Sequence, residues 1–67
     1  MKFYVQALLS RTIYNPAKEI EAKSLTGAKR ICERRFKGDI QIGTKADNDM
    51  MIYDLIGERI NGKWAMY

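Results

Sequence analysis

The sequence contains no histidine and only one cysteine, Cys32. Protein zinc sites are built from clusters of Cys and His, and a cysteine nucleophile depends on a neighbouring base that is usually His. Neither arrangement can be assembled here. A single cysteine also cannot form an intramolecular disulfide, whereas a secreted domain of this size usually has several. We therefore expect Cys32 to be a small core residue and the chain to be cytosolic.

Long apolar runs and complete nucleotide-binding motifs are absent as well. No stretch approaches the roughly 18 apolar residues of a membrane span, and no small-residue cleavage site follows the apolar N-terminal patch. The five glycines form neither a G-x-G-x-x-G loop nor a complete G-x-x-x-x-G-K-[ST] loop. Asp47, Asp49 and Asp54 lack the Gly and Glu that a calcium loop requires, so we interpret them as a solvated turn. We expect no enzyme, no metal site and no cofactor.

The chain does contain enough apolar sequence for one small domain, together with an excess of positive charge. Its 67 residues are 46% hydrophobic, which is typical of a folded globule, and we treat residues 1–67 as a single domain. There are 12 Lys and Arg against 8 Asp and Glu, a net charge of +4. This charge attracts a polyanion or an acidic protein surface, but ordinary soluble domains also carry such a charge. The distribution of the cations is therefore more informative than their number.

Apolar periodicity and turn residues predict one helix among five short strands. Asn15-Pro16 and Asn61-Gly62 have turn chemistry, and Asn-Gly favours a type I′ hairpin. Gly57 is a candidate bulge within a strand. Alternation of apolar and polar residues places the strands at residues 2–11, 18–24, 39–42, 50–60 and 63–67. The order β-β-α-β-β-β predicts an α+β domain, an antiparallel β-sheet with one α-helix packed on one face.

The helix is predicted at residues 25–37. Ser24 can cap its N-terminus through the side-chain hydroxyl, and Gly38 can end it. Apolar residues recur at helical spacing and define one face of the helix. They are Leu25, Ala28, Ile31, Cys32 and Phe36. We expect this face to pack on the sheet.

Most cations of this segment fall on the opposite side of the helix. At about 100° per residue, four of them lie within an arc of roughly 140°, centred nearly opposite the apolar arc. The four are Lys29, Arg30, Arg34 and Lys37. Glu33 lies among them and can pair with three of the four, but one acid cannot neutralise four bases. Arg35 falls at the edge of the apolar arc, so we expect its stem along the sheet and its guanidinium in solvent.

A charged helix face of this kind has two interpretations. It is often only a solvated face that keeps the helix in water. Here, however, the cations are mostly Arg, which forms bidentate bonds with carboxylates and phosphates, and most acids lie elsewhere in the chain. We therefore favour a partner-binding surface. Its candidate residues on the helix segment are Lys29, Arg30, Arg34, Arg35 and Lys37.

Tyr4 is a further candidate for partner binding. It points to the face of its strand opposite Phe3 and Val5, so we expect it at the surface. An exposed Tyr can stack on bases or anchor a protein interface. Cross-strand aromatic pairing explains the same residue equally well. Phe36 and Trp64, in contrast, are expected in the core.

The segment IEAKSLTGAKRI, residues 20–31, resembles a small group of phage-encoded anti-CRISPR proteins that disable the type I-F surveillance complex. Those proteins have a strand ending in I-E-A, a Ser-Leu entry to a helix, and a helix beginning A-K-R-I. Phe36-Lys37-Gly38 is similar to their F-x-G at the helix exit. Gly62-Lys63-Trp64 is similar to a Gly-Lys followed by Trp near their C-terminus. The resemblance touches most of the chain after residue 19.

The resemblance implies an inhibitor that binds the backbone subunits of the crRNA-guided complex in the host bacterial cytoplasm and blocks hybridisation of target DNA. The family's contacts come largely from basic helix residues, which correspond to Lys29, Arg30 and Arg34. Two alternatives stay open, a small basic DNA- or RNA-binding module and a phage inhibitor of another host enzyme. The expected partners are the surveillance complex and, non-specifically, nucleic acid. No membrane is expected, and the chain is expected to be a monomer or weak dimer.

Overall fold

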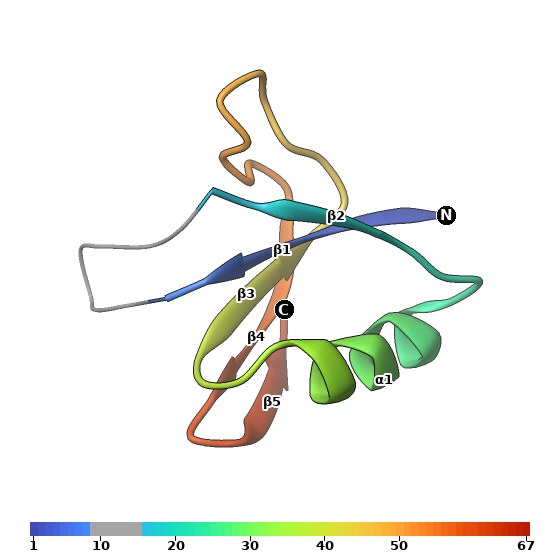
Figure 1. The fold of residues 1–67 in the computed structure, drawn as a ribbon, viewed down its shortest axis with the longest axis vertical. Helices are drawn as coiled ribbons and strands as arrows, with labels where there is room; N and C mark the ends of the chain where they lie inside the picture. The colour runs from blue at the N-terminus through green and yellow to red at the C-terminus, as the bar shows by residue number, and fades with distance from the viewer. Residues whose placement is uncertain (9–15) are drawn as a thin grey trace.

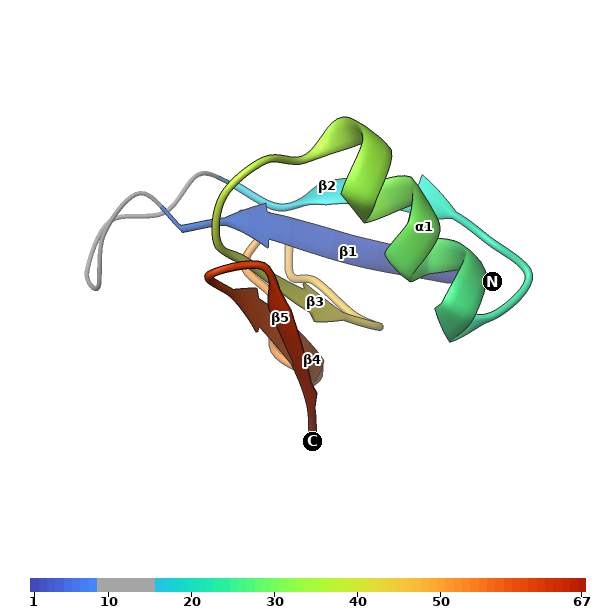
Figure 2. The same ribbon diagram turned by 90° about the horizontal axis from the view of Figure 1, so that it is seen from below.

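The computed structural model describes residues 1–8 and 16–67, which form one helix on one face of a five-stranded antiparallel sheet (Figures 1 and 2). The strand order is β2-β1-β3-β4-β5. Along the chain the elements are β1 (Lys2–Ala7), β2 (Lys18–Glu21), α1 (Leu25–Arg35), β3 (Ile40–Gly43), β4 (Leu55–Ile60) and β5 (Lys63–Met66). The predicted α+β class and the predicted order of elements are confirmed.

The core lies between α1 and the sheet face that points toward it. Because side chains alternate between the two faces of a strand, every second residue of the central strands is buried there. The buried cluster consists of Phe3, Val5, Ile20, Ala28, Cys32, Ile40 and Ile42. Cys32 is thus a core residue, as predicted. Phe36 and Trp64 are half-buried and pack against the edge of this core rather than within it.

The opposite face of the sheet is partly covered by residues 44–54, the segment between β3 and β4. Gln6 points to this face yet is buried, and its amide nitrogen lies 3.5 Å from the sulfur of Met51. Gly43 lies against Ile52, so closely that a Cβ at residue 43 would clash with that side chain and with the Asp54 carbonyl. A glycine is therefore required where this segment crosses the sheet.

The N-cap of α1 is the predicted Ser24, but the C-cap is Phe36 and not the predicted Gly38. The Ser24 hydroxyl accepts a hydrogen bond from the Gly27 amide at 3.2 Å, which satisfies a free donor of the first turn. The helix ends at Arg35, two residues earlier than predicted, because Phe36 is extended with φ −120°. Gly38 has φ +80° and turns the chain toward β3, which favours glycine at this position.

The β4–β5 hairpin also agrees with its turn chemistry. Asn61 has φ 53° and Gly62 has φ 79°, the positive values of a type I′ turn. The predicted irregularity in β4 is displaced by one residue. Ile42 pairs with Gly57 and Gly43 with Leu55, so the extra residue of the ladder is Ile56 and Gly57 itself is regularly paired.

The first two strands are shorter than predicted. β1 ends at Ala7, followed by Leu8, whose amide donates to the Asp39 carbonyl at 2.9 Å. Residues 9–11 of the predicted strand and Asn15 of the predicted turn lie outside the described residues. β2 ends at Glu21 instead of residue 24, because the helix cap uses Ser24.

The prediction of strand at residues 50–54 is wrong. Met50 has a positive φ of 58°, and Ile52 forms only an isolated bridge with Ala46. The Asp47 carboxylate accepts hydrogen bonds from the amides of Asp49 and Met51, both at 2.9 Å, and this holds a local turn. Side-chain bonding to the backbone therefore overrides the apolar run MMIY.

Within residues 1–8 and 16–67 there is no helix with the length and apolar character needed to cross a bilayer.

Candidate functional site: the cationic face of α1

The cations predicted on one side of the helix are mostly exposed in the structure. We call Lys29, Arg30, Arg34 and Lys37 the cationic face. Arg30 and Arg34 lie on the exposed side of α1, and Lys29 is half-buried beside the sheet. Lys37 is exposed but follows the end of the helix, so its place is set by the chain after Phe36 and not by helical periodicity.

No acid of the described residues forms an ion pair with these cations. The ion pairs within residues 1–8 and 16–67 join the Met1 amino group to Glu21 and Lys2 to Glu19, at 3.1 and 3.8 Å. Both lie on β1 and β2. Glu33, which the sequence places among the cations, forms no ion pair with them in this part of the chain. The charges of Arg30, Arg34 and Lys37, which are exposed, are therefore available to a partner.

Two helix cations contact aromatic rings of their own molecule. The Lys29 ammonium lies 5.3 Å from the centre of the Trp64 ring, within the range of a cation–π interaction. The Arg35 guanidinium lies 5.9 Å from the centre of the Phe36 ring, and Arg35 is exposed. The exposure of Arg35 agrees with the expected guanidinium in solvent, whereas the course of its stem along the sheet stays a prediction. At about 100° per residue, Arg35 points to a different side of the helix from the cationic face.

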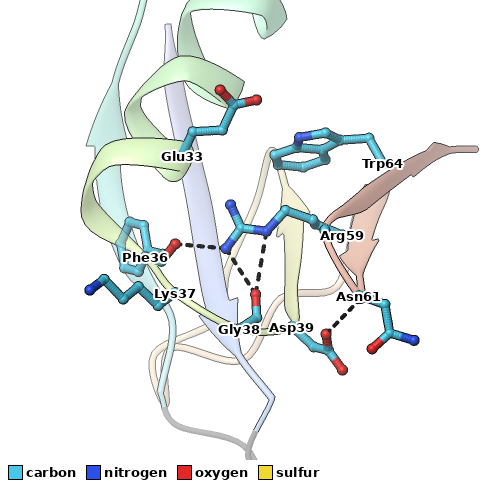
Figure 3. A pocket seen from close by; sticks show the side chains of 9 residues that line it. Glu33, Phe36, Lys37, Gly38, Asp39, Arg59, Asn61 and Trp64 are labelled. Atoms are coloured by element: carbon cyan, nitrogen blue, oxygen red, sulfur yellow. Dashed lines mark hydrogen bonds between the residues drawn. The ribbon is translucent and has the colours of Figure 1, made fainter.

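Arg59 on β4 is a buried cation that sequence reasoning missed. It is 7% exposed, and its guanidinium fits against the C-terminal end of α1 (Figure 3). Nη2 donates to the carbonyls of Phe36 and Gly38 at 2.6 and 2.8 Å. Nε donates to Gly38 at 3.3 Å and Nη1 to Cys32 at 3.4 Å. The last carbonyls of a helix lack partners within the helix, and Arg59 supplies donors to them.

An open hollow of about 510 Å³ lies between this helix end and the β4–β5 hairpin (Figure 3). Its lining consists of Glu33, Phe36, Lys37, Gly38, Asp39, Arg59, Asn61, Gly62 and Trp64. The donors of Arg59 are already used by carbonyls, and the Asp39 carboxylate accepts from the Asn61 amide at 3.0 Å. The indole nitrogen of Trp64 is buried and has no partner among the described residues. With cations and acids both at its rim, the hollow does not form an anion site.

Tyr4 lies on the sheet face opposite the helix. It is half-buried and directly opposite Glu19 in the β1–β2 ladder, and its hydroxyl donates to that carboxylate at 3.3 Å. The structure thus brings Tyr4 into a cross-strand contact and separates it from the cationic face by the thickness of the sheet. Its role as a partner contact stays a prediction, on a different surface.

Most of the side chains considered above for catalysis or metal binding are buried or hydrogen-bonded within the fold. Burial raises the pKa of the Cys32 thiol, against the opposing effect of the Arg59 charge, so the thiol is not activated. Asp54 accepts from the Thr44 hydroxyl at 3.0 Å, and Asp47 holds the local turn described above. In the described part of the chain, no three Cys, Asp or Glu side chains could hold a metal ion together.

Residues 57–63, GERINGK, have the spacing G-x-x-x-x-G-K of a phosphate-binding loop without its final Ser or Thr. In the structure they form β4, the type I′ turn and the start of β5. A phosphate-binding loop connects a strand to a helix, whose N-terminal amides surround the phosphates. This segment has no such helix, so the spacing is coincidental.

The signal for a buried Arg59 was weak in the sequence. Apolar alternation in β4 runs through Ile56 and Ile60, which points Arg59 away from the predicted core side. The structure has the reverse arrangement, because the extra residue at Ile56 shifts the alternation.

No family model, curated protein or solved structure matched this chain.

Proposed function

We propose that this chain is a binding protein without catalytic activity, and that the cationic face of α1 docks on an acidic or nucleic-acid-binding surface of a macromolecular partner. The observation that carries the proposal is the state of the cations. Arg30, Arg34 and Lys37 are exposed, and no acid of the described chain is paired with them. Exposed guanidinium groups can bind carboxylates or phosphates in a bidentate manner.

The opposite side of the helix supports a rigid presentation of this face. Ala28 and Cys32 are fully buried, Ser24 caps the first turn, and Arg59 binds the carbonyls of the last turn. A docking helix fixed at both ends loses little conformational freedom on binding, which favours affinity.

The resemblance to type I-F anti-CRISPR proteins suggests a specific partner. We propose that the chain, as a phage protein in the host cytoplasm, binds the backbone subunits of the crRNA-guided surveillance complex. Lys29, Arg30 and Arg34 would then occupy surface that target DNA needs, so that hybridisation with the guide is blocked. This part of the proposal is based on the motifs at residues 20–31, 36–38 and 62–64.

Two triple variants test the cationic face. The first combines Arg30→Glu, Arg34→Glu and Lys37→Glu, which reverses exposed charges without removing a described side-chain contact. The control combines Lys18→Glu, Lys23→Glu and Lys45→Glu, which changes the net charge equally at exposed positions elsewhere. Phage or plasmid interference is measured in type I-F hosts that express each protein. We expect the wild type and the control to suppress interference, and the first variant to have lost this activity.

The same experiment can reject the proposal in two ways. Interference that is unchanged by the wild-type protein removes the CRISPR target. Equal activity of the two triple variants removes the cationic face as the docking surface. Circular dichroism of both variants, with the wild-type helix signal expected, excludes unfolding as the cause of a loss.

Direct nucleic-acid binding is the second candidate, and exposed Arg30 and Arg34 favour it because each can contact a phosphate. It predicts an affinity for random duplex DNA that falls with salt, with a log–log slope of about −0.9 for each phosphate contacted. A gel shift or anisotropy titration at several salt concentrations measures this slope. Absence of binding at low salt would leave the protein partner as the target.

A further inference from the structure

The two edges of the sheet differ in how they are protected against pairing with another strand. β2 and β5 are the outermost strands, so each has backbone groups with no strand beside them. Natural proteins usually protect such an edge with charged side chains. β2, with sequence KEIE, has three charged residues among four. β5, with sequence KWAM, has one.

The hydrogen-bond pattern identifies the free backbone groups of β5. The Tyr67 amide donates to the Ile56 carbonyl at 3.0 Å, and the type I′ turn joins Ile60 to Lys63. In an antiparallel ladder the residues that bond to one neighbour alternate with those that face away. The amides and carbonyls of Trp64 and Met66 therefore point outward from the sheet, toward the place of a next strand.

Apolar side chains surround these free groups. Met66 is 39% exposed and Tyr67 is 69% exposed, and Leu55 is also exposed on the adjacent strand. These are three of the five large apolar side chains that are exposed among the described residues. Trp64 is half-buried next to Met66 on the helix side of the sheet. An edge with unpaired backbone groups and apolar neighbours favours strand pairing.

We propose that β5 pairs with β5 of a second copy of this chain, antiparallel, to give a dimer with one continuous sheet. A second copy fits because the edge is self-complementary. With Ala65 of both copies on the two-fold axis, Trp64 faces Met66 of the second copy and Met66 faces Trp64. Each such pair exchanges two backbone hydrogen bonds. On the helix side, an indole ring then lies beside a thioether, which is a favourable contact.

Charge also fits this register at the ends of the paired strands. Lys63 lies opposite Tyr67 of the second copy. Within one copy, the Tyr67 hydroxyl donates to the Glu58 carboxylate at 2.9 Å. The ammonium of Lys63 therefore approaches a tyrosine and a carboxylate, and not another cation. Because a two-fold axis of this kind keeps each sheet face continuous, both α1 helices lie on the same side of the dimer.

The pairing is short, so the dimer is a weak one. Five residues on each side, 63–67, bury less surface than a standard stable interface. This inference does not depend on the proposed function, because the edge of β5 can pair whatever binds to α1.

A cysteine scan tests the register. In an antiparallel sheet, residues opposite each other in a pair without mutual hydrogen bonds have Cα atoms about 4.5 Å apart, which a disulfide can bridge. Ala65 is predicted to face Ala65 of the second copy in such a pair. Ala65→Cys should therefore form a disulfide-linked dimer with oxidised glutathione. Lys63→Cys is the matched control, since its cysteines would face Tyr67 and stay apart.

The wild-type protein is measured by sedimentation velocity over a range of concentrations, with Met66→Pro and Glu21→Pro. Met66→Pro removes the outward amide of β5 while keeping the bonds to β4. Glu21→Pro makes the same change at the outer edge of β2, because the Ala22 amide bonds to Met1 and the Glu21 amide faces away. We expect Met66→Pro to raise the dimer dissociation constant roughly tenfold or more, and Glu21→Pro to leave it unchanged.

Three results would overturn the inference. The first is a wild-type protein that stays monomeric up to about 1 mM. The second is crosslinking of Lys63→Cys as fast as Ala65→Cys. The third is an equal effect of the two proline variants. Loss of DNA or surveillance-complex binding has no bearing on any of these readouts, so failure of the proposed function is distinguishable from failure of the dimer.

Discussion

The molecule has two groups of cations that differ in environment more than in chemistry. Arg59 is buried, and its guanidinium donates four hydrogen bonds to three main-chain carbonyls. Arg30 and Arg34 are exposed on α1, and no acid of the described chain pairs with them. Lys29 lies between the two groups, half-buried with its ammonium over Trp64. A positive charge near this helix therefore stabilises the fold at one position and is free for binding at another.

The difference has a physical cause. The C-terminal carbonyls of α1 carry partial negative charge that water cannot fully reach, so a buried guanidinium there is compensated. On the outer side of the helix, water solvates each cation and an ion pair would contribute little stability. We therefore expect substitution of Arg59 to reduce mainly stability, and substitution of the exposed cations to reduce mainly binding.

The largest expected change in stability is that of Arg59→Met. The substitution keeps an aliphatic side chain but leaves the carbonyls of Phe36 and Gly38 without their donor, whereas the Cys32 carbonyl keeps its bond from the Phe36 amide. Unsatisfied, partly buried carbonyls and lost charge-assisted hydrogen bonds predict a loss of about 2 kcal/mol in the free energy of unfolding. Urea denaturation followed by circular dichroism measures it. Arg34→Met is the control, and equal losses in the two variants would contradict the distinction between the groups.

The second largest effect is expected from alkaline pH, which acts on the buried thiol of Cys32 near Arg59. Burial raises the pKa of the Cys32 thiol above its ordinary value of 9.0, while the Arg59 charge opposes this rise. The folded chain thus keeps a proton that the unfolded chain releases. The thiol's contribution is complete below pH 9.0 and is lost as pH rises from there through the raised pKa, at most about 1.4 kcal/mol per pH unit.

The measurement for this prediction is the free energy of unfolding between pH 7 and 10.5, for the wild type and Cys32→Ala. We expect the difference between the two proteins to shrink above pH 9, because only the wild type has this thiol. A constant difference over the whole range would show that the thiol does not titrate with unfolding.

A smaller effect is expected at Lys29, the cation between the two groups. Lys29→Gln removes the charge over the Trp64 ring, which at a partly exposed site is worth about 0.5 kcal/mol. The same change should increase quenching of tryptophan fluorescence by acrylamide, because part of the ring becomes accessible. Arg30→Gln, one residue further along the helix, serves as control. If both variants give the wild-type quenching constant, Lys29 does not cover the ring in solution.

The smallest change in stability is expected for Arg34→Gln. Arg34 lies in the last turn of α1, where a cation interacts with the helix dipole, so removal of its charge should cost about 0.3 kcal/mol. Its effect on binding should be larger than its effect on stability. Chemical denaturation and the interference assay, performed on the same preparation, compare the two. A stability loss as large as that of Arg59→Met would place Arg34 with the structural cations.

Much of the fold could be predicted because its signals are local. Ser24 caps a helix through its own hydroxyl, Asn61-Gly62 adopts positive φ values, and Phe3 and Val5 alternate with polar residues. The exposed cations of the helix followed from helical periodicity in the same way. A turn was expected around Asp47 and Asp49, but strand was wrongly predicted from residue 50. There the apolar run competes with hydrogen bonds from backbone amides to one carboxylate, that of Asp47.

The sequence by itself determined the order of the elements, the apolar side of α1 and the charge on its other side, since each depends on neighbours within about four residues. Only the tertiary structure decided that Arg59 is buried, that Lys29 covers Trp64 and that Tyr4 bonds to Glu19. These outcomes depend on the register of the strands and on the position of α1 over the sheet. Contacts between residues far apart in the chain set both, and no local pattern contains them.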